Sequence, residues 1–294
     1  SVNCTYEAEN HAILAKNVWN PDFAEQTAFL TADQPPHGLT TDRKEFLGRE
    51  GSLEYPAGLQ RWGLEGTAES GIDPCGAYQV HLELDPGQSE EVIFILGQGT
   101  DRTHATSLIA DWKNLDKIEA EFEKLRAYWD DLLGAIEVHT PDPAFNIMVN
   151  RWLLYQSMSS RLLARAGFYQ ASGAIGFRDQ LQDVMAFLHN DPARARKHIL
   201  ACASHQFEQG DVLHWWHPPT DRGVRTRCSD DLLWLPYVVC EYVKATGDET
   251  ILHEKVPYLR APPLSSEEED RYSDFEFGAV DQNLKDHCER ALEC

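Results

Sequence analysis

The first hundred residues have the pattern of short β-strands separated by turns. Residues 80–84 alternate, residues 85–88 (Asp-Pro-Gly-Gln) supply a turn, and residues 92–96 are predicted to return as a more buried strand. Glycines and prolines between residues 51 and 66 divide the chain into further strand-sized pieces. We expect an antiparallel β-sandwich over residues 1–102. We expect it to be incomplete, because a sandwich of ordinary size needs more strands than this stretch offers.

After Thr103 the apolar period changes to that of a helix. Leu115, Ile118, Phe122 and Leu125 recur three or four residues apart, in a segment rich in Leu, Glu, Lys and Ala. No motif that carries chemistry occurs there. The pattern predicts an amphipathic helical linker over residues 103–140.

Residues 141–294 read as a further series of helices. Asp191-Pro192 is an N-cap followed by proline at the first helical position, and Gly247 lies where a C-terminal glycine cap belongs. Pro236 predicts a kink or a late start in the fourth helix. The predicted helices span about 144–165, 179–189, 192–209, 229–247, 248–258 and 281–293.

The connections between these helices alternate in length. Those at 166–178, 210–228 and 259–280 are long, whereas 190–192 and 246–249 are short. In antiparallel helices every second connection lies at the same end, so the long ones should share one rim. Stacked hairpins of this kind build an α/α toroid. A helical solenoid would also alternate, but the chain lacks the fixed repeat of a solenoid.

Composition narrows the classes of partner. The chain has 48 acidic and 26 basic residues, a net charge of -22, which repels nucleic acid and anionic membrane surfaces but not a neutral sugar. No apolar run is long enough to cross a bilayer. Seven irregularly spaced cysteines favour free thiols in a reducing, cytoplasmic compartment. The histidines form no metal-binding motif, so we expect no metal.

The N-terminus indicates that the chain is part of a longer one. It lacks an initiator methionine, and it lacks the basic region and apolar core of a signal peptide.

The first candidate site residues lie at the end of the first long connection. Arg178, Asp179 and Asp183 stand beside glycines that let backbone approach a ligand closely. Carboxylates accept hydrogen bonds from sugar hydroxyls, and arginine donates them. The alternative is a helix cap at Asp179 and a surface ion pair of little energetic value.

The second long connection carries aromatic and charged residues. Its candidates for substrate binding are His214, Trp215, Trp216, Arg227, Asp230 and Asp231. Indole faces pack against the C–H faces of sugar rings. The alternative is that one Trp belongs to the core and the other anchors the loop. The cluster of Arg222, Arg225 and Arg227 indicates either anion binding, such as phosphate, or compensation of the two aspartates.

Several of these stretches resemble glycoside hydrolase family 94, the inverting β-glycoside phosphorylases. The family includes cellobiose and chitobiose phosphorylases and the C-terminal region of cyclic β-1,2-glucan synthases. Phe29-Leu30 and residues 41–49 resemble the synthase branch and its relatives most. The stretches that carry the resemblance are Gly-Phe-Arg-Asp-Gln-Leu-Gln-Asp (176–183), Gly-Asp-Val-Leu-His-Trp-Trp-His-Pro-Pro (210–219) and Gly-Val-Arg-Thr-Arg-Cys-Ser-Asp-Asp-Leu-Leu-Trp-Leu-Pro (223–236), with 262–264 and 270–272.

The resemblance implies an α+β multidomain fold and an activity. The fold would be a partial β-sandwich (1–102), a helical linker (103–140) and the first half of an (α/α)6 barrel (141–294). The activity would be inverting phosphorolysis or transfer on β-linked glucosides, with inorganic phosphate as co-substrate and no other cofactor. Arg178 and Asp183, with Asp179, match the donor-sugar pocket, and residues 214–231 would line the same mouth. The partner would be an oligosaccharide or β-glucan, and a synthase parent would be membrane-attached.

One departure from the family pattern bears on activity. The general acid of the family lies in a Trp-Asn-Asp motif, which this chain lacks, so we expect that residue beyond Cys294 and no catalytic residue in the chain. The fragment alone should be inactive, and its unpartnered helix faces favour a homodimer. Two alternatives stay open: a non-catalytic carbohydrate-binding fragment, and an inverting α/α-barrel hydrolase using Asp183 or Asp230, with carboxylates about 6.5–9.5 Å apart.

Overall fold

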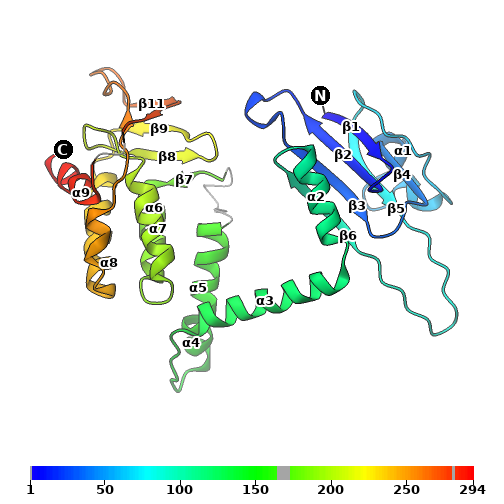
Figure 1. Ribbon diagram of the computed structural model, residues 1–294, viewed down its shortest axis with the longest axis horizontal. Helices are drawn as coiled ribbons and strands as arrows, with labels where there is room; N and C mark the ends of the chain where they lie inside the picture. The colour runs from blue at the N-terminus through cyan, green and yellow to red at the C-terminus, as the bar shows by residue number, and fades with distance from the viewer. Residues whose placement is uncertain (1, 164–172, 280–281) are drawn as a thin grey trace. The chain divides into compact units, whose positions relative to one another are not determined.

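The computed structural model describes residues 2–163, 173–279 and 282–294, and Figure 1 shows their strands and helices. The chain divides into two compact units, residues 1–125 and 126–294. The division falls within the segment predicted as a linker, whose boundaries at 103 and 140 stay a prediction. The mixture of helices and antiparallel strands confirms the α+β class.

Antiparallel sheets form most of the first unit. One has the order β1-β2-β3-β6, and β4 pairs with β5 in another. Their bounds are Val2–Glu7 (β1), Ala12–Asn17 (β2), Thr27–Ala32 (β3), Gly38–Asp42 (β4), Pro74–Gln79 (β5) and Phe94–Gly99 (β6), with short helices at Pro21–Phe23 (η1), Arg43–Leu47 (α1) and Ala57–Gln60 (η2).

The helix α2 (Arg102–Trp112) packs on β6 and β3. Asp101 caps it by accepting a hydrogen bond from the His104 N–H at 2.8 Å. Buried Leu14 and Phe29 of the sheet meet Ala105 and Ile109 of the helix, which forms the core of this unit.

The predicted hairpin over residues 80–96 is wrong in its first strand. Residues 80–93 form a long extended loop (Figure 1). The turn exists, because the Gln88 N–H donates to the Asp85 carbonyl at 2.9 Å, but the returning strand begins at Phe94 and pairs with β3. Leu82 and Leu84 are exposed, and the returning strand is not the buried one predicted, because Phe94 and Leu96 are exposed as well. An alternating pattern therefore does not produce a strand here, because no surface in the described part of the chain packs against Leu82 and Leu84.

The predicted linker helix is two helices, α2 and α3 (Leu115–Gly134). The break falls where the Asn114 side chain accepts a hydrogen bond from the Lys117 N–H at 3.2 Å, which starts a new helix. The next predicted helix is an unbroken run with α and π turns: Pro143–Ile147 (α4), Met148–Trp152 (η3), Leu153–Gln156 (α5) and Ser157–Leu163 (η4).

The remaining helices follow the predicted caps. Asp191 caps α7 with Pro192 at its first position, Gly247 ends α8 in the left-handed region, and Pro236 stands in the first turn of α8, a late start. The third predicted helix ends early, at Ala203, and the fifth is a 3-10 turn. The bounds are Phe177–Val184 (α6), Met185–Phe187 (η5), Pro192–Ala203 (α7), Asp231–Leu233 (η6), Trp234–Thr246 (α8), Glu249–His253 (η7) and Leu284–Glu293 (α9).

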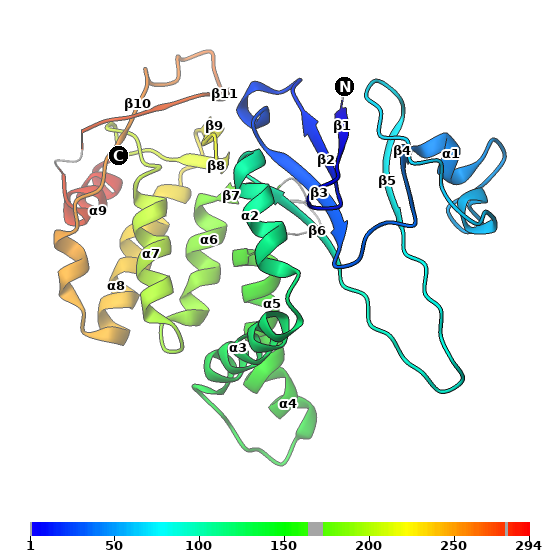
Figure 2. The same cartoon turned by 45° about the vertical axis from the view of Figure 1, so that its right-hand side comes forward.

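The core of the second unit lies between α6, α7, α8 and α9. Phe177 and Leu181 of α6, Ile199 of α7 and Leu235 of α8 have no exposed surface. Burying such side chains contributes about 1.5–3 kcal/mol each. Figures 1 and 2 show α6, α7 and α8 side by side and alternating in direction.

The long connections meet at one end of these helices, as predicted, but as a sheet rather than loops (Figures 1 and 2). Most of the first connection, residues 164–172, lies outside the described residues. The strands Ile175–Gly176 (β7), Leu213–His217 (β8), Arg222–Thr226 (β9) and Asp270–Ser273 (β11) pair in the order β11-β9-β8-β7, and Leu259–Arg260 (β10) pairs with Glu276–Phe277 (β12). We call this end of the second unit the rim.

The half-barrel arrangement stays a prediction. The stripe of Phe145, Met148, Trp152 and Tyr155, which would face the inside of a toroid, is 42–50% exposed. The homodimer predicted from such faces likewise stays a prediction. Among the described residues, no helix is both long and apolar enough to span a membrane.

A buried ion pair joins the rim sheet to the segments beneath it. Arg225 of β9 is 1% exposed and donates two hydrogen bonds of 2.6 Å to the Asp211 carboxylate. It also donates to the carbonyls of Ala261 and Pro262, and it stacks on the Phe207 ring at 3.8 Å. The sequence hypotheses of anion binding and of compensation for Asp230 both fail for Arg225, because its donors are used inside the fold.

Replacing Arg225 with Met should destabilise the second unit by about 3–5 kcal/mol, because Asp211 would lose the partner of its charge in a partly buried place. Arg222→Met is the matched control. Its ion pair with Asp274 is exposed and should contribute less than about 1 kcal/mol. Urea unfolding of both variants measures the difference. Equal losses would show that Arg225 has no special structural role.

Candidate functional site

The first turn of α6 and the start of η6 bring opposite charges together at the rim. Arg178 donates from Nη1 to Asp230 Oδ2 at 3.0 Å, and its Nε lies 3.9 Å from Asp231 Oδ1. The local fold explains the meeting. β7 pairs with β8 and leads directly into α6, so Arg178, in the first turn of α6, lies beside the segment that follows the β8–β9 hairpin. The Asp230 hydrogen bond holds the pKa of Arg178 above its ordinary value and lowers that of Asp230.

Asp231 is the buried member of this group. It is 1% exposed, whereas the Asp230 side chain is 54% exposed. His214 Nδ1 lies 2.6 Å from Asp231 Oδ2, and this hydrogen bond raises the pKa of His214 against the opposing effect of burial. Asp231 Oδ1 accepts no hydrogen bond from the described residues. Arg178 and Asp231 thus form an ion pair without a hydrogen bond.

Asp183 stands one and a half turns further along α6, with a different arginine. Arg161 of η4 donates from Nε to Asp183 Oδ2 at 2.8 Å. Burial raises the pKa of Asp183, and the Arg161 guanidinium opposes that rise. The charge of Asp179 raises the pKa values of both Asp183 and His214. Asp179 therefore interacts electrostatically with both the Arg161–Asp183 pair and the His214–Asp231 pair.

The two tryptophans of β8 have different environments. Trp216 is 2% exposed and stacks on His205, with ring centroids 3.8 Å apart and planes at 13°. It belongs to the core and offers no free face. Trp215 is half-buried, with its ring 5.6 Å from that of exposed Tyr272. A sugar platform can therefore be proposed for Trp215 but not for Trp216.

Arg227 and Arg222 bind within the fold like Arg225. Arg227 donates to the carbonyls of Glu268 at 2.9 Å and Ser265 at 2.6 Å, which fixes the turn before β11. Arg222 forms two hydrogen bonds with Asp274. The charge of Asp230 is balanced by Arg178. The hypothesis that Arg222, Arg225 and Arg227 compensate the two aspartates is therefore wrong for Asp230.

Sequence reasoning missed three residues of this region: Arg161, Cys228 and Tyr272. Arg161 lies among serines and leucines of a predicted helix, and the sequence offers no signal that distinguishes it from Arg151 and Arg165 of the same predicted helix. Tyr272 belongs to the Asp-Arg-Tyr stretch at 270–272, which carried the resemblance but was given no role.

Three potential metal ligands gather at the site. The donor atoms of His214, Cys228 and Asp231 lie within 4.8 Å of one another. However, the Arg178 cation lies 3.9 Å from Asp231, His214 Nδ1 is hydrogen-bonded to the same carboxylate, and burial and Asp230 raise the pKa of Cys228. A positive charge already faces the carboxylate and the thiol resists ionisation, so we assign no metal to this group.

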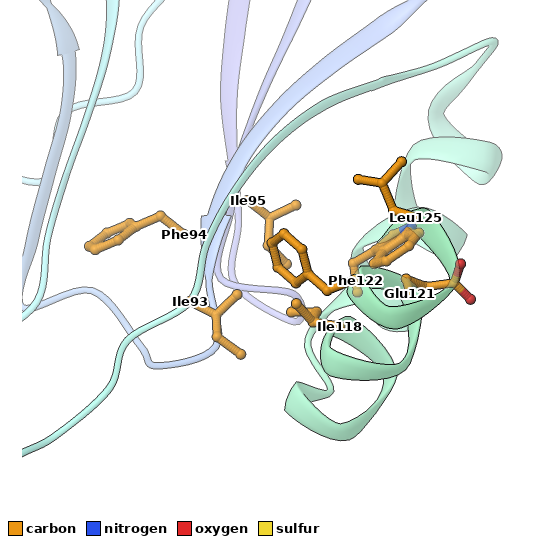
Figure 3. A pocket seen from close by; sticks show the side chains of 8 residues that line it. Ile93, Phe94, Ile95, Ile118, Glu121, Phe122 and Leu125 are labelled. Carbon is orange, nitrogen blue, oxygen red and sulfur yellow. The ribbon is translucent and has the colours of Figure 1, made fainter. Parts of the chain in front are cut away.

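An apolar hollow of about 380 Å³ lies in the first unit (Figure 3). Ile93 and Ile95 face Ile118, Phe122 and Leu125 of α3 across it (Figure 3). Glu121 is the one charged group in its lining. With Glu121 and Trp112 as the polar side chains of its lining, this surface offers fewer groups to orient a sugar than the rim does, so the candidate site is the rim.

Replacing Arg161 with Gln should raise the pKa of Asp183 further. Because its folded-state pKa is already raised, Asp183 costs stability as pH rises above its ordinary value of 3.8 and through the raised value. The variant should therefore lose more stability than the parent as pH rises through this window. Urea unfolding at several pH values measures the loss. The double variant with Asp183→Asn should lack the extra pH dependence, and an unchanged slope in Arg161→Gln would contradict the assignment.

Comparison with known proteins identifies the family. Residues 1–115 match the model of the glycosyl hydrolase 94 supersandwich domain, and residues 128–263 match that of the glycosyl hydrolase 94 superfamily catalytic domain. The cyclic β-(1,2)-glucan synthase of Rhizobium meliloti is 40% identical over 96% of this chain, which spans 10% of the synthase.

Phosphorylases are similar at lower identity. The N,N′-diacetylchitobiose phosphorylase of Vibrio proteolyticus is 27% identical over 82% of the chain, and the solabiose phosphorylase of Paenibacillus borealis is 30% identical over 88%. The chain spans 33% and 32% of these two proteins. The resemblance found in the sequence is confirmed: the chain belongs to glycoside hydrolase family 94, and its two units correspond to the supersandwich and catalytic domains of that family.

Proposed function

We propose that this chain supplies the donor-sugar side of an active site that transfers a β-linked glucosyl group, to inorganic phosphate or to another sugar. The observation that carries the proposal is the pairing of Arg178 with Asp230 at the rim, with a second acid, Asp183, held by Arg161 further along the same helix α6. The names of the relatives, a glucan synthase and several phosphorylases, support a carbohydrate substrate.

Each exposed group at the rim has a role in this proposal. Arg178, held by Asp230, donates hydrogen bonds to sugar hydroxyls, and the exposed oxygens of Asp230 accept them. Asp183 accepts hydroxyl hydrogens while Arg161 fixes its carboxylate. Trp215 offers its ring face to the C–H face of a sugar. Asp179, whose charge acts on both Asp183 and His214, is proposed to bind the same ligand.

The proposed reaction is phosphorolysis with inversion. Phosphate attacks the anomeric carbon, the glycosidic C–O bond breaks, and a general acid protonates the leaving oxygen. Because phosphate is the nucleophile, no separate general base is needed, unlike in an inverting hydrolase. The chain contains no Trp-Asn-Asp motif, so we expect it to bind sugar without cleaving it by itself. The (α/α)6 barrel and a cytoplasmic location belong to the same proposal.

A second candidate is an inverting hydrolase. Burial raises the pKa of Asp183, whereas the Arg178 hydrogen bond lowers that of Asp230. A split of this kind assigns an acid and a base to two carboxyl groups. However, each of these carboxylates is paired with an arginine, which favours its ionised form. Ligand binding therefore fits both groups better than proton transfer.

Phosphate dependence separates the two candidates. The full natural chain should release a sugar 1-phosphate from a β-glucan, and only when inorganic phosphate is supplied. Product analysis with and without phosphate, in buffer free of phosphate, measures this. Release of reducing sugar at the same rate without phosphate would favour the hydrolase and exclude phosphorolysis.

Arg178→Ala should weaken saccharide binding about 10- to 100-fold, the equivalent of losing hydrogen bonds from a charged donor worth about 1.5–3 kcal/mol. Arg196→Ala is the matched control, because Arg196 on α7 also pairs with two acids, Asp248 and Glu254, but away from the rim. Titration calorimetry compares the two. Equal affinity in both variants would remove Arg178 from the site.

A further inference from the structure

Asp231 differs from the other acids of the rim in what it can touch. Its side chain is 1% exposed, so a ligand at the rim has no access to it. Both of its oxygens nevertheless face groups that a ligand can reach. Oδ2 lies 2.6 Å from His214 Nδ1, and Oδ1 lies 3.9 Å from Arg178 Nε. The His214 and Arg178 side chains are each 35% exposed.

The hydrogen bond to Asp231 determines which edge of the His214 ring faces the ligand. With Nδ1 bound to the buried carboxylate, Nε2 is the nitrogen left for a ligand, and no described residue forms a hydrogen bond with it. When His214 is protonated, Nε2 carries a hydrogen and donates; when it is neutral with its hydrogen on Nδ1, Nε2 can only accept. Asp231 thereby controls both the orientation of the ring and its donor capacity.

We propose that Asp231 is a positioning residue that holds His214 and Arg178 side by side as two donors for oxygen atoms of the bound saccharide, so that binding weakens when His214 loses its proton. The proposal rests on the proposed saccharide site. It gives Asp231 a role through other residues, in place of the direct ligand contact predicted from sequence.

Among the residues that the structure describes, four charged or titratable groups face His214. Asp231 and Asp179 raise its pKa, Arg178 and burial lower it, and the Cys228 thiol stands within 4.8 Å of its nearest nitrogen. The pKa lies above the ordinary 6.5, with the Asp231 hydrogen bond as the largest cause. The protonated form therefore persists to higher pH than in a solvated histidine and is lost as pH rises through the raised value.

The experiment uses the full natural chain and the neutral disaccharides sophorose and cellobiose as probes. Neither probe titrates between about pH 5 and 9, where an unperturbed His changes charge. Any pH dependence of affinity in this range comes from the protein. Titration calorimetry gives the affinity, and histidine C2 hydrogen–deuterium exchange read by mass spectrometry gives the midpoint of His214 without a ligand.

Asp231→Asn is the diagnostic variant, because it keeps the shape and the hydrogen-bond acceptor but removes the charge. In the parent, affinity should fall about 10-fold as His214 deprotonates. In Asp231→Asn this fall and the His214 midpoint should both move to lower pH, and in His214→Gln the fall should be absent. His253→Gln, in η7, is the control and should keep the parent profile.

Two results would overturn the proposal: a parent-like profile and His214 midpoint in Asp231→Asn, or a parent-like fall in His214→Gln. If Asp231→Asn does not fold, His214→Gln alone decides. Failure of the proposed function is separable. If neither disaccharide binds the parent at any pH, the saccharide site is wrong, whereas the His214 midpoint still reports whether Asp231 controls the ring.

Discussion

Backbone pairing between β7 and β8 is the constraint on which the candidate site depends. Ile175 pairs with Trp216 and Gly176 with Trp215, and α6 begins at the next residue. The pairing therefore fixes the start of α6 next to a hairpin that is distant in sequence. Gly223 of β9 makes the hairpin tight, because an added Cβ would lie 2.5 Å from the Trp215 carbonyl oxygen. Side chains of α6 meet those of the hairpin and of the segment that follows it because the sheet brings these elements together.

Local charge balance explains how an acidic chain keeps a rim rich in arginine. The partners of these arginines differ with burial. Arg225, buried, satisfies a carboxylate and two carbonyls, while Arg178, at the surface, pairs with an exposed acid that solvent also reaches. Desolvation of the buried Arg225–Asp211 pair is compensated only while both partners are present, so losing either one destabilises the fold. The exposed Arg178–Asp230 pair contributes little energy, so Arg178 can exchange Asp230 for a ligand at small cost.

Local signals were read correctly from the sequence, and pairings between distant segments were not. Asp191-Pro192 and Gly247 marked helix ends because capping is a short-range interaction. The alternation of long and short connections predicted a shared rim, because that prediction needs only the lengths of the connections and no knowledge of which segments pair. The sheet at that rim was missed because β7 has two residues and β8 has two adjacent tryptophans instead of clear alternation. The hairpin at 80–96 failed because alternation carries no information about its partner strand.

The adjacent aspartates at 230 and 231 show why a motif alone cannot assign roles. In sequence they are equivalent, and both were expected to contact substrate. A single step along the turn into η6 exposes one and buries the other, so only Asp230 can meet a ligand. In the role we propose for it, the buried carboxylate of Asp231 acts through the orientation and protonation of the His214 ring, with which it is hydrogen-bonded. Burial therefore decides which of two adjacent acids a ligand can reach, and burial depends on the whole rim.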